Sequence, residues 1–242
     1  MLPKRIERPG RTIIIEGLIA AGKTSLAIEL GRALGDETTL VLLEPADGEH
    51  KNPYLVDYYS DQERYALPMQ IWLLYQRYNM HLHAQYHVQN HAGDAVLDRS
   101  YFGDVSFARV QRKLGFMDER DFGTYLGVYH AMTRHVLFPA VCIRLLVDPK
   151  TSLYRINRRM EDRAGRKCES VVDIGYLQAL DEEITITTEF LRSQGTMILD
   201  IGWDTDRETE EQRQQAVDGI IQRILSHTPP SIAAAIHQRV IG

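Results

Sequence analysis

The segment Gly-Leu-Ile-Ala-Ala-Gly-Lys-Thr at residues 17–24 constrains this chain more than any other feature. It follows an apolar run at residues 12–16 and opens an apolar helical pattern at residues 23–34. A strand, a glycine-containing loop and a helix in this order form the G-x-x-x-x-G-K-[ST] phosphate loop. The glycines let backbone N–H groups turn inward, and the helix directs its positive end at the same place. The segment therefore predicts binding of a nucleoside triphosphate.

Individual residues of the loop have expected roles in this binding. Lys23 is expected to reach the β- and γ-phosphates, and the hydroxyl of Thr24 is expected to bind Mg²⁺. The loop residues expected to contact the nucleotide are Gly17, Ala20, Ala21, Gly22, Lys23, Thr24 and Ser25. A turn that matches the motif by chance is the alternative interpretation.

The composition is typical of a globular enzyme. The 242 residues are 44% hydrophobic and 25% charged, and no glycine- or serine-rich linker divides them. The net charge of −5 argues against a general nucleic-acid-binding protein, which needs a basic surface. Cys142 and Cys168 lack the spacing of metal ligands or of a redox pair. Because no signal segment and no run of about eighteen apolar residues is present, we expect a cytoplasmic protein without membrane contact.

Short apolar runs alternate with helical patterns along the chain. The sequence predicts strands at residues 12–16, 39–43, 95–98, 140–147 and 196–201. It predicts helices at residues 23–34, 61–91, 104–114, 119–137, 150–160, 174–193 and 206–226. Apolar runs without alternation are typical of a parallel sheet that is buried on both faces. We therefore expect an α/β fold in one domain (residues 1–242), with a doubly wound, five-stranded parallel sheet flanked by helices and a loosely packed tail at residues 228–242.

The segment at residues 155–169 is rich in arginine. One interpretation is a solvated helix surface with ion pairs between residues four apart. The other is a basic lid that closes over phosphates and excludes water. The phosphate loop elsewhere in the chain favours the lid, whose expected phosphate contacts are Arg155, Arg159, Arg163 and Arg166.

Two other predicted strands end in charged residues. Glu44 precedes Pro45 at the end of the second strand, and Asp98 and Arg99 end the third. Because the carboxyl ends of parallel strands meet at one edge of a sheet, we expect these residues beside the phosphate loop. One carboxylate can accept a proton from an attacking hydroxyl, the other can hold Mg²⁺, and an arginine can neutralise a moving phosphoryl group. A simple strand exit at Glu44 and a helix cap at Asp98 are the structural alternatives.

Several further segments carry a resemblance to a known family through their order and spacing. They are the run YSDQERYALPMQ at residues 59–70, Arg77, the run DRSYFGDVSF at residues 98–107, Glu169 with the Tyr-Leu pair at 176–177, and the strand near Asp204. Together with the phosphate loop and the Glu-Pro pair they cover nearly the whole chain. The sequence resembles the deoxyribonucleoside kinases, which transfer the γ-phosphate of a nucleoside triphosphate to the 5′-hydroxyl of a deoxynucleoside.

The resemblance implies roles around the transferred phosphate. Glu44 matches the general base that deprotonates the 5′-hydroxyl. Arg99 matches the arginine that binds the acceptor end and the moving phosphoryl group, and Lys23 completes the catalytic set. Asp98 stands where many members have glutamate, and with Thr24 it is implied to hold Mg²⁺. ATP is implied as the phosphate donor, with Asp204 among the residues that bind it.

The resemblance also implies an acceptor pocket. Tyr59 and Glu169 match the pair that binds the sugar 3′-hydroxyl, Gln70 matches the amide that pairs with the base, and Phe107 matches the aromatic residue that stacks on it. An amide offers both a donor and an acceptor, and an aromatic face stacks on any base. Without the resemblance, Phe107 is equally a helix core residue, and Gln70 and Tyr59 are equally helix-surface residues.

Two charged positions bear on the preferred base. In the resembling family, members that act on purine deoxynucleosides and deoxycytidine have an arginine and an aspartate where this chain has Arg77 and Asp104. Opposite charges projecting into one pocket can pair and recognise bases that carry an amino group. The resemblance therefore implies deoxyadenosine, deoxyguanosine or deoxycytidine as the substrate in preference to thymidine.

Other functions and the assembly state remain open at this point. A nucleoside-monophosphate kinase of the thymidylate-kinase type shares the loop and strand ends, but it usually has a glycine-rich turn where this chain has Ala46 and Asp47. A noncatalytic nucleotide-binding protein is a second alternative, and a kinase that acts on DNA is a third, although stable nucleic-acid binding is not expected. The resemblance implies a homodimer formed through the helices at residues 61–91 and 119–137, whose apolar residues are equally compatible with a core position.

Overall fold

Five parallel strands form a single sheet with the strand order β2-β3-β1-β4-β5. The strands are β1 (Thr12–Gly17), β2 (Leu40–Leu42), β3 (Ala95–Asp98), β4 (Val141–Leu146) and β5 (Met197–Gly202). Every neighbouring pair is parallel, so all carboxyl ends meet at one edge. This computed structural model describes residues 10–35, 37–44, 52–91, 93–162, 169–205 and 209–226. The predicted α/β fold with a five-stranded parallel sheet is confirmed.

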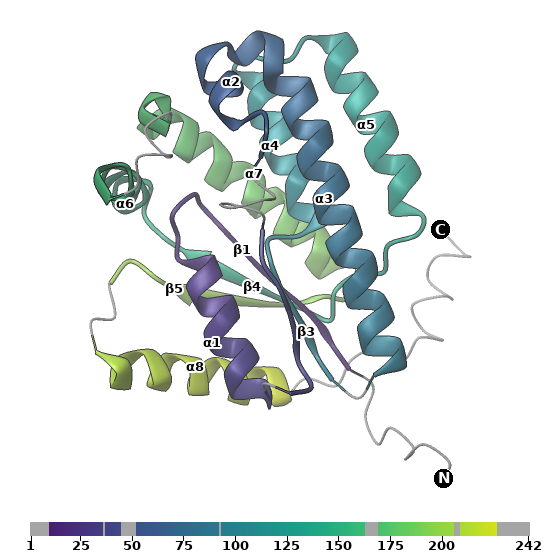
Figure 1. Ribbon diagram of the computed structural model, residues 1–242, viewed down its shortest axis with the longest axis vertical. Coiled ribbons are helices and arrows are strands. Elements are labelled where there is room, and N and C mark those ends of the chain that lie inside the picture. Colours follow the sequence, from purple (N-terminus) through teal and green to yellow (C-terminus); the bar gives the residue numbers. More distant parts are fainter. Residues whose placement is uncertain are drawn as a thin grey trace.

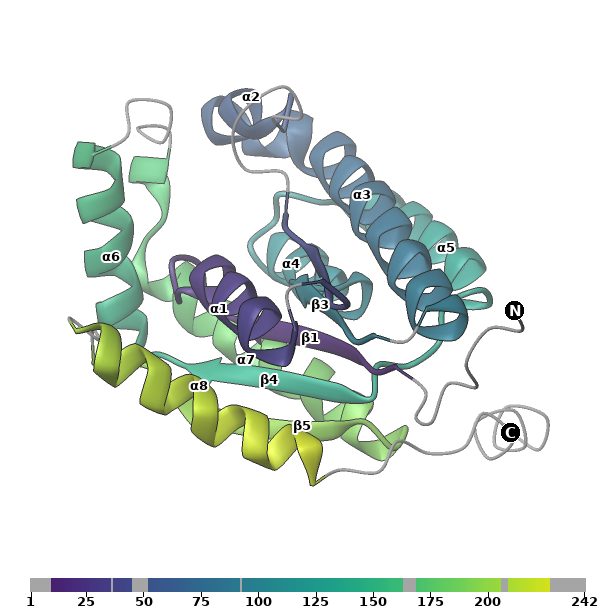
Figure 2. The same ribbon diagram turned by 60° about the horizontal axis from the view of Figure 1, so that its bottom comes forward.

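Helices cover both faces of the sheet (Figure 1). They are α1 (Lys23–Gly35), α2 (Leu55–Ser60), α3 (Gln62–Asn90), α4 (Tyr101–Lys113), α5 (Glu119–Thr133), α6 (Pro149–Asp162), α7 (Ile174–Ser193) and α8 (Glu210–Leu225). The pair α1 and α8 lies on one side, and α3, α4 and α5 lie on the other, as the turned view in Figure 2 also shows. No described helix combines the length and the hydropathy that crossing a membrane requires.

The core explains why the first strand is apolar without alternation. Ile13 and Ile15 pack with side chains of α1 and α8, including Leu26. Ile14 points to the opposite face and packs with side chains of α3, α4, α5 and α7, including Leu191. Successive strand residues face opposite sides, so a strand covered on both faces must be apolar at each position. Glu16 breaks this rule, and its partners belong to the site described below.

Helix boundaries show where local sequence reasoning was wrong. α4 begins at Tyr101 and not at residue 104, because the Ser100 side chain caps it by accepting a hydrogen bond of 3.0 Å from the N–H of Gly103. The short α2 was not predicted. The last helix begins at Glu210, where Thr209 and Gln212 form a capping box, and not at residue 206. α5 ends at Thr133 and not at residue 137. The other elements match their predictions within about two residues.

Candidate active site

The phosphate loop leaves β1 at Gly17 and enters α1 at Lys23. Gly17 and Gly22 have φ angles of 151° and 90°, in the region that favours glycine. A Cβ at Gly17 would lie 2.9 Å from the carbonyl oxygen of Leu145, and one at Gly22 would lie 3.0 Å from the indole nitrogen of Trp203. Both motif glycines are therefore required by backbone conformation and by close packing. Ala20 also has a positive φ of 56°.

Lys23 is buried at the centre of this loop. Its ammonium group donates hydrogen bonds to the carbonyl oxygens of Leu18 (2.6 Å) and Gly17 (3.4 Å). Burial, and secondarily the charge of Arg99, lowers the pKa of Lys23 to about 7, although Asp98 and Glu44 oppose the shift. An anion in the loop would restore the charged form, because opposite charges stabilise it.

Thr24 and Asp98 lie together at the carboxyl edge. The hydroxyl of Thr24 donates a hydrogen bond to Oδ2 of Asp98. Because the side chain of Ser100 caps α4, the helix-cap alternative for Asp98 is wrong. Among the described residues, Oδ1 of Asp98 has no hydrogen-bond partner, although it is buried. Mg²⁺ is usually held by one or two protein oxygens together with substrate phosphates, and these two residues fit that need. The described part of the chain contains no group of three or more His, Cys, Asp or Glu side chains that could hold a metal.

Glu44 lies just beyond β2, between two arginines. Arg77 donates to Oε1 of Glu44 from Nε (3.2 Å) and from Nη2, and Nε of Arg99 lies 3.5 Å from Oε2. Burial raises the pKa of Glu44, but Arg77, Arg99 and Lys23 together lower it to about 2. Glu44 is therefore ionised in a positively charged setting. Glu44 is also not remote from Lys23.

Arg99 adopts a left-handed backbone conformation with a φ of 67°. Such conformations are costly for residues other than glycine and concentrate at functional sites. The backbone N–H donates to the carbonyl oxygen of Ile15 (3.1 Å), and Nη1 donates to that of Gly17 (3.2 Å). The guanidinium carbon lies 4.6 Å from the centre of the Phe107 ring. This conformation turns the Arg99 side chain back over the phosphate loop.

A buried polar network lies next to Glu44. Nη1 of Arg77 pairs with Oδ1 of Asp104. Oδ2 of Asp104 accepts hydrogen bonds from Gln70 (3.0 Å) and from the hydroxyl of Tyr125 (2.6 Å). The Arg77 guanidinium also lies 5.4 Å from the Phe107 ring centre. The predicted pairing of Arg77 and Asp104 is present, and Gln70 is fully buried, so its reading as a surface residue is wrong.

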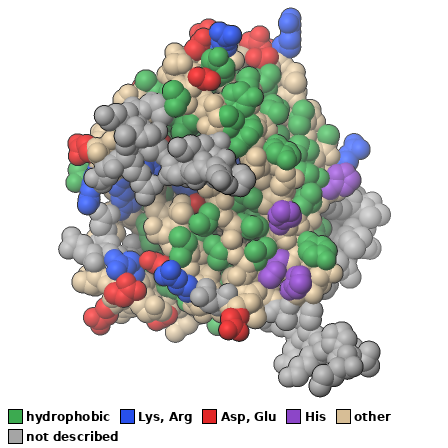
Figure 3. All heavy atoms as spheres, in the orientation of Figure 1, with side chains coloured by type: hydrophobic (Ala, Val, Ile, Leu, Met, Phe, Trp, Pro, Cys, Tyr) green, Lys and Arg blue, Asp and Glu red, His purple; other side chains and the backbone are tan. Residues whose placement is uncertain are grey.

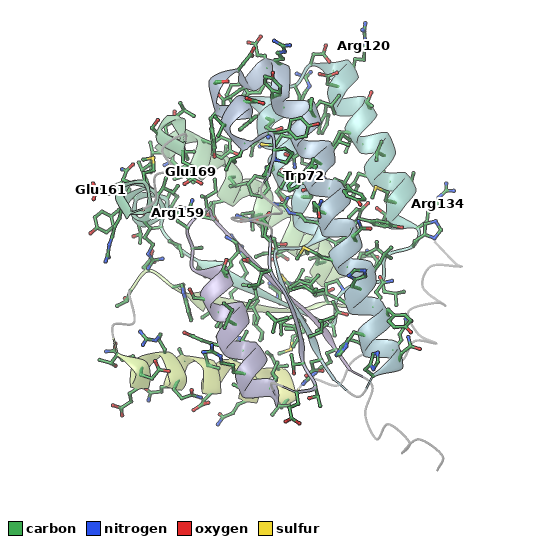
Figure 4. The ribbon with its side chains drawn as sticks, viewed as in Figure 1. Trp72, Arg120, Arg134, Arg159, Glu161 and Glu169 are labelled. Carbon is green, nitrogen blue, oxygen red and sulfur yellow. The ribbon has the colours of Figure 1, made fainter. Side chains whose placement is uncertain are left out.

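Glu169 pairs with an arginine of α6. It is 2% exposed, and its Oε2 accepts a hydrogen bond of 2.6 Å from Nη2 of Arg159 in α6. Both side chains are labelled in Figure 4. Tyr59 packs against the cluster that contains Phe107, and its ring centre lies 5.2 Å from that of the more deeply buried Tyr58. The predicted lid residues Arg163 and Arg166, together with Cys168 and the tail at 228–242, lie outside the described residues.

A second group of predicted residues borders the loop on the side of β5. Arg155 donates to the carbonyl oxygens of Trp203 (3.0 Å) and Asp204 (2.9 Å), and Oδ1 of Asp204 accepts from the N–H of Asp148 (2.6 Å). A pocket of about 180 Å³ adjoins them, lined by Ala20, Ala21, Gly22, Ser25, Leu26, Glu29, Arg155, Trp203, Thr205 and Arg213. The loop, Arg155 and the segment after β5 therefore share one cavity.

Sequence reasoning missed several residues of the two groups. Trp203 and Thr205 flank Asp204 just after β5, and their position at the carboxyl end of a strand could have identified them. Glu29 and Arg213 come from α1 and α8, and no local pattern marks them. Gln111, which donates to Oε1 of Gln70 (3.2 Å), was also missed, as was Tyr125. Glu16 was missed too, although an acid inside an apolar strand is itself a signal.

The chain is similar to known proteins over most of its length. The family model for deoxynucleoside kinase matches residues 13–226. A deoxyguanosine kinase from Dictyostelium discoideum is 36% identical over 201 residues, covering 83% of this chain and 66% of the relative. A deoxyadenosine kinase from the same organism is 36% identical over 171 residues, covering 71% of this chain and 64% of the relative. The chain thus spans slightly under two thirds of the length of these two relatives.

Two further comparisons extend the likeness. A deoxyadenosine/deoxycytidine kinase from Bacillus subtilis is 32% identical over 171 residues, covering 69% of this chain and 72% of the relative. The solved structure of the deoxyadenosine kinase from M. mycoides with bound dATP has a TM-score of 0.70 at 23% identity, covers 89% of this chain and 100% of that one, and shows the shared fold. The match of the family model over most of the sequence shows that this chain belongs to the deoxynucleoside kinase family.

Proposed function

We propose that this protein transfers the γ-phosphate of ATP to the 5′-hydroxyl of a deoxynucleoside. The observation that carries the proposal is the position of Glu44 between the guanidinium groups of Arg77 and Arg99, close enough to Lys23 for the two charges to interact. A triphosphate loop and an ionised carboxylate thus meet at one edge of the sheet. Phosphoryl transfer to a hydroxyl needs this arrangement, because it depends on positioning and on charge stabilisation.

The donor side uses the loop. Backbone N–H groups of residues 20–25 and the ammonium of Lys23 bind the phosphates. Thr24 and Asp98 would hold Mg²⁺, which supplies positive charge to the triphosphate. Arg155 lines the pocket beside the loop and donates to the carbonyl oxygen of Asp204, and we assign both residues to the donor nucleotide. Contacts of Arg159, Arg163 and Arg166 with phosphate stay predictions.

Glu44 acts as the proton acceptor. With a pKa of about 2 it is a weak base, since the best general bases have pKa values near the working pH. A phosphoryl group that draws Arg99 towards itself removes part of the positive charge beside Glu44, and the basicity of the carboxylate rises. Arg99 then neutralises the phosphoryl group during transfer. The shared arginine therefore couples phosphate binding to the activation of the base.

The acceptor pocket favours bases with an amino group. Asp104 accepts hydrogen bonds from Gln70, Arg77 and Tyr125, so its carboxylate is held at a defined place. Its partner Arg77 lies 5.4 Å from the centre of the Phe107 ring. Exocyclic amino groups of adenine, guanine and cytosine can donate to such acceptors, whereas thymine has none. The names of the relatives, which include deoxyguanosine and deoxyadenosine kinases, support the same preference. We assign Phe107 to base stacking.

The sugar contacts are proposed on the resemblance. Tyr59 and Glu169 are assigned to the 3′-hydroxyl, since a tyrosine and a carboxylate can together satisfy a buried hydroxyl. Glu169 already pairs with Arg159. The sugar hydroxyl therefore either donates to Glu169 alongside Arg159 or takes the place of Arg159.

Assays of deoxyadenosine, deoxyguanosine, deoxycytidine and thymidine with ATP and Mg²⁺ test the proposal. We expect turnover with at least one of the first three above that with thymidine, and loss of turnover when Mg²⁺ is chelated. Thymidine as the best substrate would contradict the base preference, and no turnover with any acceptor would favour a noncatalytic nucleotide-binding protein. The corresponding monophosphates serve as competing acceptors, and faster turnover with one of them would identify a monophosphate kinase.

We also propose that two chains pair through α3 and α5. Large hydrophobic side chains are exposed on these helices: Tyr75 (54%), Tyr86 (64%) and Val128 (37%). Hydrophobic side chains gather over both helices on the face shown in Figure 3. An apolar hollow on α3 is lined by Tyr54, Leu67, Pro68, Ile71, Trp72 and Tyr75. Light scattering tests this pairing, and the mass of a single chain at micromolar concentration would contradict it.

A further inference from the structure

Glu16 is an acidic residue inside an otherwise apolar strand. Every residue of β1 is buried, and Glu16 is 1% exposed. A buried carboxylate is costly unless other groups compensate for its charge. Its side chain faces α4, because it lies on the same side of the strand as Ile14. An acid retained at this cost one residue before the phosphate loop calls for a physical explanation.

One oxygen of Glu16 serves the start of α4. Oε1 accepts a hydrogen bond of 2.7 Å from the hydroxyl of Ser100, which also caps the helix. A Cβ at Gly103 would lie 2.3 Å from Oε1, so only glycine allows the first turn of α4 to approach the carboxylate this closely. The positive end of the helix further favours a negative charge here. These contacts hold the carboxylate in one position.

The other oxygen faces Arg99. Oε2 of Glu16 has no hydrogen-bond partner among the described residues, and it lies 3.8 Å from Nη1 of Arg99. On its other side, Arg99 has Oε2 of Glu44 at 3.5 Å from its Nε. One guanidinium group thus lies between two carboxylates at similar distances. Burial raises the pKa of Glu16, and Arg99, Ser100, Arg77 and Lys23 counter this effect, so the charge of Glu16 depends on these neighbours.

We propose that Glu16 is a positioning residue that holds Arg99 away from full pairing with Glu44. This inference rests on the proposed kinase function. Arg99 already has a strained backbone and a contact with the Gly17 carbonyl oxygen, and Glu16 provides the opposing charge that keeps its side chain over the loop. Without that charge, Arg99 moves onto Glu44. The base then becomes harder to protonate, and the arginine is no longer placed to receive the phosphoryl group.

A double-mutant cycle on the full chain tests the proposal. Glu16→Gln keeps the side-chain shape and the ability to accept a hydrogen bond from Ser100, but it removes the charge. We expect kcat to fall by at least about tenfold while the KM values for ATP and for the deoxynucleoside stay within about twofold. In an Arg99→Ala background, measured with radiolabelled ATP, the same change should alter kcat by less than about twofold.

Ser100→Ala is the matched control, because it removes the hydrogen bond to the same carboxylate and the cap of α4 but leaves the charge. It should lower Tm while reducing kcat less than Glu16→Gln does. If Glu16→Gln does not fold, Glu16→Asp takes its place, because it keeps the charge but moves it away from Arg99. We expect Glu16→Asp to lower kcat by less than about tenfold, and we expect no such loss in the Arg99→Ala background.

Equal losses of kcat with and without Arg99, or no loss at all, would overturn the role of Glu16. These outcomes are distinct from failure of the proposed function, in which the unaltered protein itself would show no phosphorylation of any deoxynucleoside. An active protein with additive variants therefore refutes only the positioning role.

Discussion

Arg77 donates to Glu44 from two of its nitrogens, Nε and Nη2, while its third nitrogen pairs with Asp104. A single guanidinium group therefore joins the proposed proton acceptor to the proposed base-recognition network. Arginine suits this place because its planar fork can hold two carboxylates in fixed directions. The correct base in the pocket and the correct orientation of Glu44 are thereby linked through one side chain.

Glu44→Gln is predicted to abolish most of the activity without loss of the fold. The amide keeps the shape but cannot accept the proton of the 5′-hydroxyl, so kcat should fall by about 10²–10⁴-fold. Single-turnover assays and ATP titrations check this prediction, with ATP affinity expected to stay within about twofold. Asp57→Asn, at an exposed position of α2, is the matched control and should leave kcat unchanged. Unchanged turnover in a folded Glu44→Gln preparation would rule out the base assignment.

Arg77→Lys is predicted to impair nucleoside selection despite retaining the charge. An ammonium group cannot reach Glu44 and Asp104 in the same two-pronged way. We expect kcat/KM for the preferred deoxynucleoside to fall by at least about tenfold, and its advantage over thymidine to shrink, while the KM for ATP changes little. Competition assays with mixed deoxynucleosides measure this ratio. An unaltered ratio would show that Arg77 does not contribute to base preference.

ATP binding above neutral pH is predicted to take up a proton. Burial and Arg99 lower the pKa of Lys23 to about 7, so the Lys23 side chain is mostly neutral at about pH 8 before ATP binds. The triphosphate favours the ammonium form, and close to one proton should be bound with each ATP at about pH 8 and far less at about pH 6. Calorimetry in buffers with different ionisation enthalpies measures the uptake. In Lys23→Arg, where the side chain is always charged, the uptake should vanish, and its persistence would point to another group.

His81 is predicted to make stability depend on pH. It is buried, its ring bonds to the carbonyl oxygen of Leu137, and burial lowers its pKa from 6.5 to about 4. Between these values the unfolded chain binds the proton and the folded chain does not, so stability is complete above about pH 6.5 and is lost as the pH falls towards 4. The loss from this residue at about pH 5 should be about 2 kcal/mol.

Urea unfolding of His81→Gln checks this value. The difference in unfolding free energy between about pH 7 and pH 5 should shrink by about 2 kcal/mol in the variant. His83→Gln, at an exposed position of the same helix, should leave the difference as it is. If the difference in unfolding free energy is unchanged in His81→Gln, the buried ring does not cause the loss of stability at acid pH.

Asp94→Ala is predicted to destabilise the fold while sparing the chemistry. Arg11 is buried, its Nη2 lies 2.6 Å from Asp94, and its Nη1 donates to the carbonyl oxygen of Ile224 at the end of α8. Removing Asp94 leaves a buried charge without its partner, which costs about 3–5 kcal/mol. Urea unfolding measures the loss of stability. The kcat of the remaining folded protein should not change, because Arg11 and Asp94 lie at the amino-terminal ends of β1 and β3, whereas the site lies at the carboxyl ends of the strands. Asp94→Asn should lose less, and equal losses would argue against a charge effect.

Sequence reasoning reached the fold class and one edge of the site because both follow from local patterns. Continuous apolar runs identified each strand, and the glycine spacing identified the phosphate loop that connects β1 to α1. Parallel strands bring their carboxyl ends to one edge, so the sequence predicts that Glu44, Asp98 and Arg99 lie near Lys23. The start of α4 was misjudged because Asp104 was taken as its first residue, whereas Ser100 is the side chain that caps it.

Contacts between residues distant in the chain required the folded structure. Arg77 and Glu44 are 33 positions apart, and Ser100 and Glu16 are 84 apart, so nothing local specifies that they meet. The pocket formed by Glu29, Trp203 and Arg213 is similarly assembled from separate elements. Short-range backbone preferences and the loop motif are encoded residue by residue, whereas pairing of buried charges depends on how whole helices pack against the sheet. That packing gives Glu44 two arginine neighbours: it shares Arg77 with Asp104, and it shares Arg99 with Glu16.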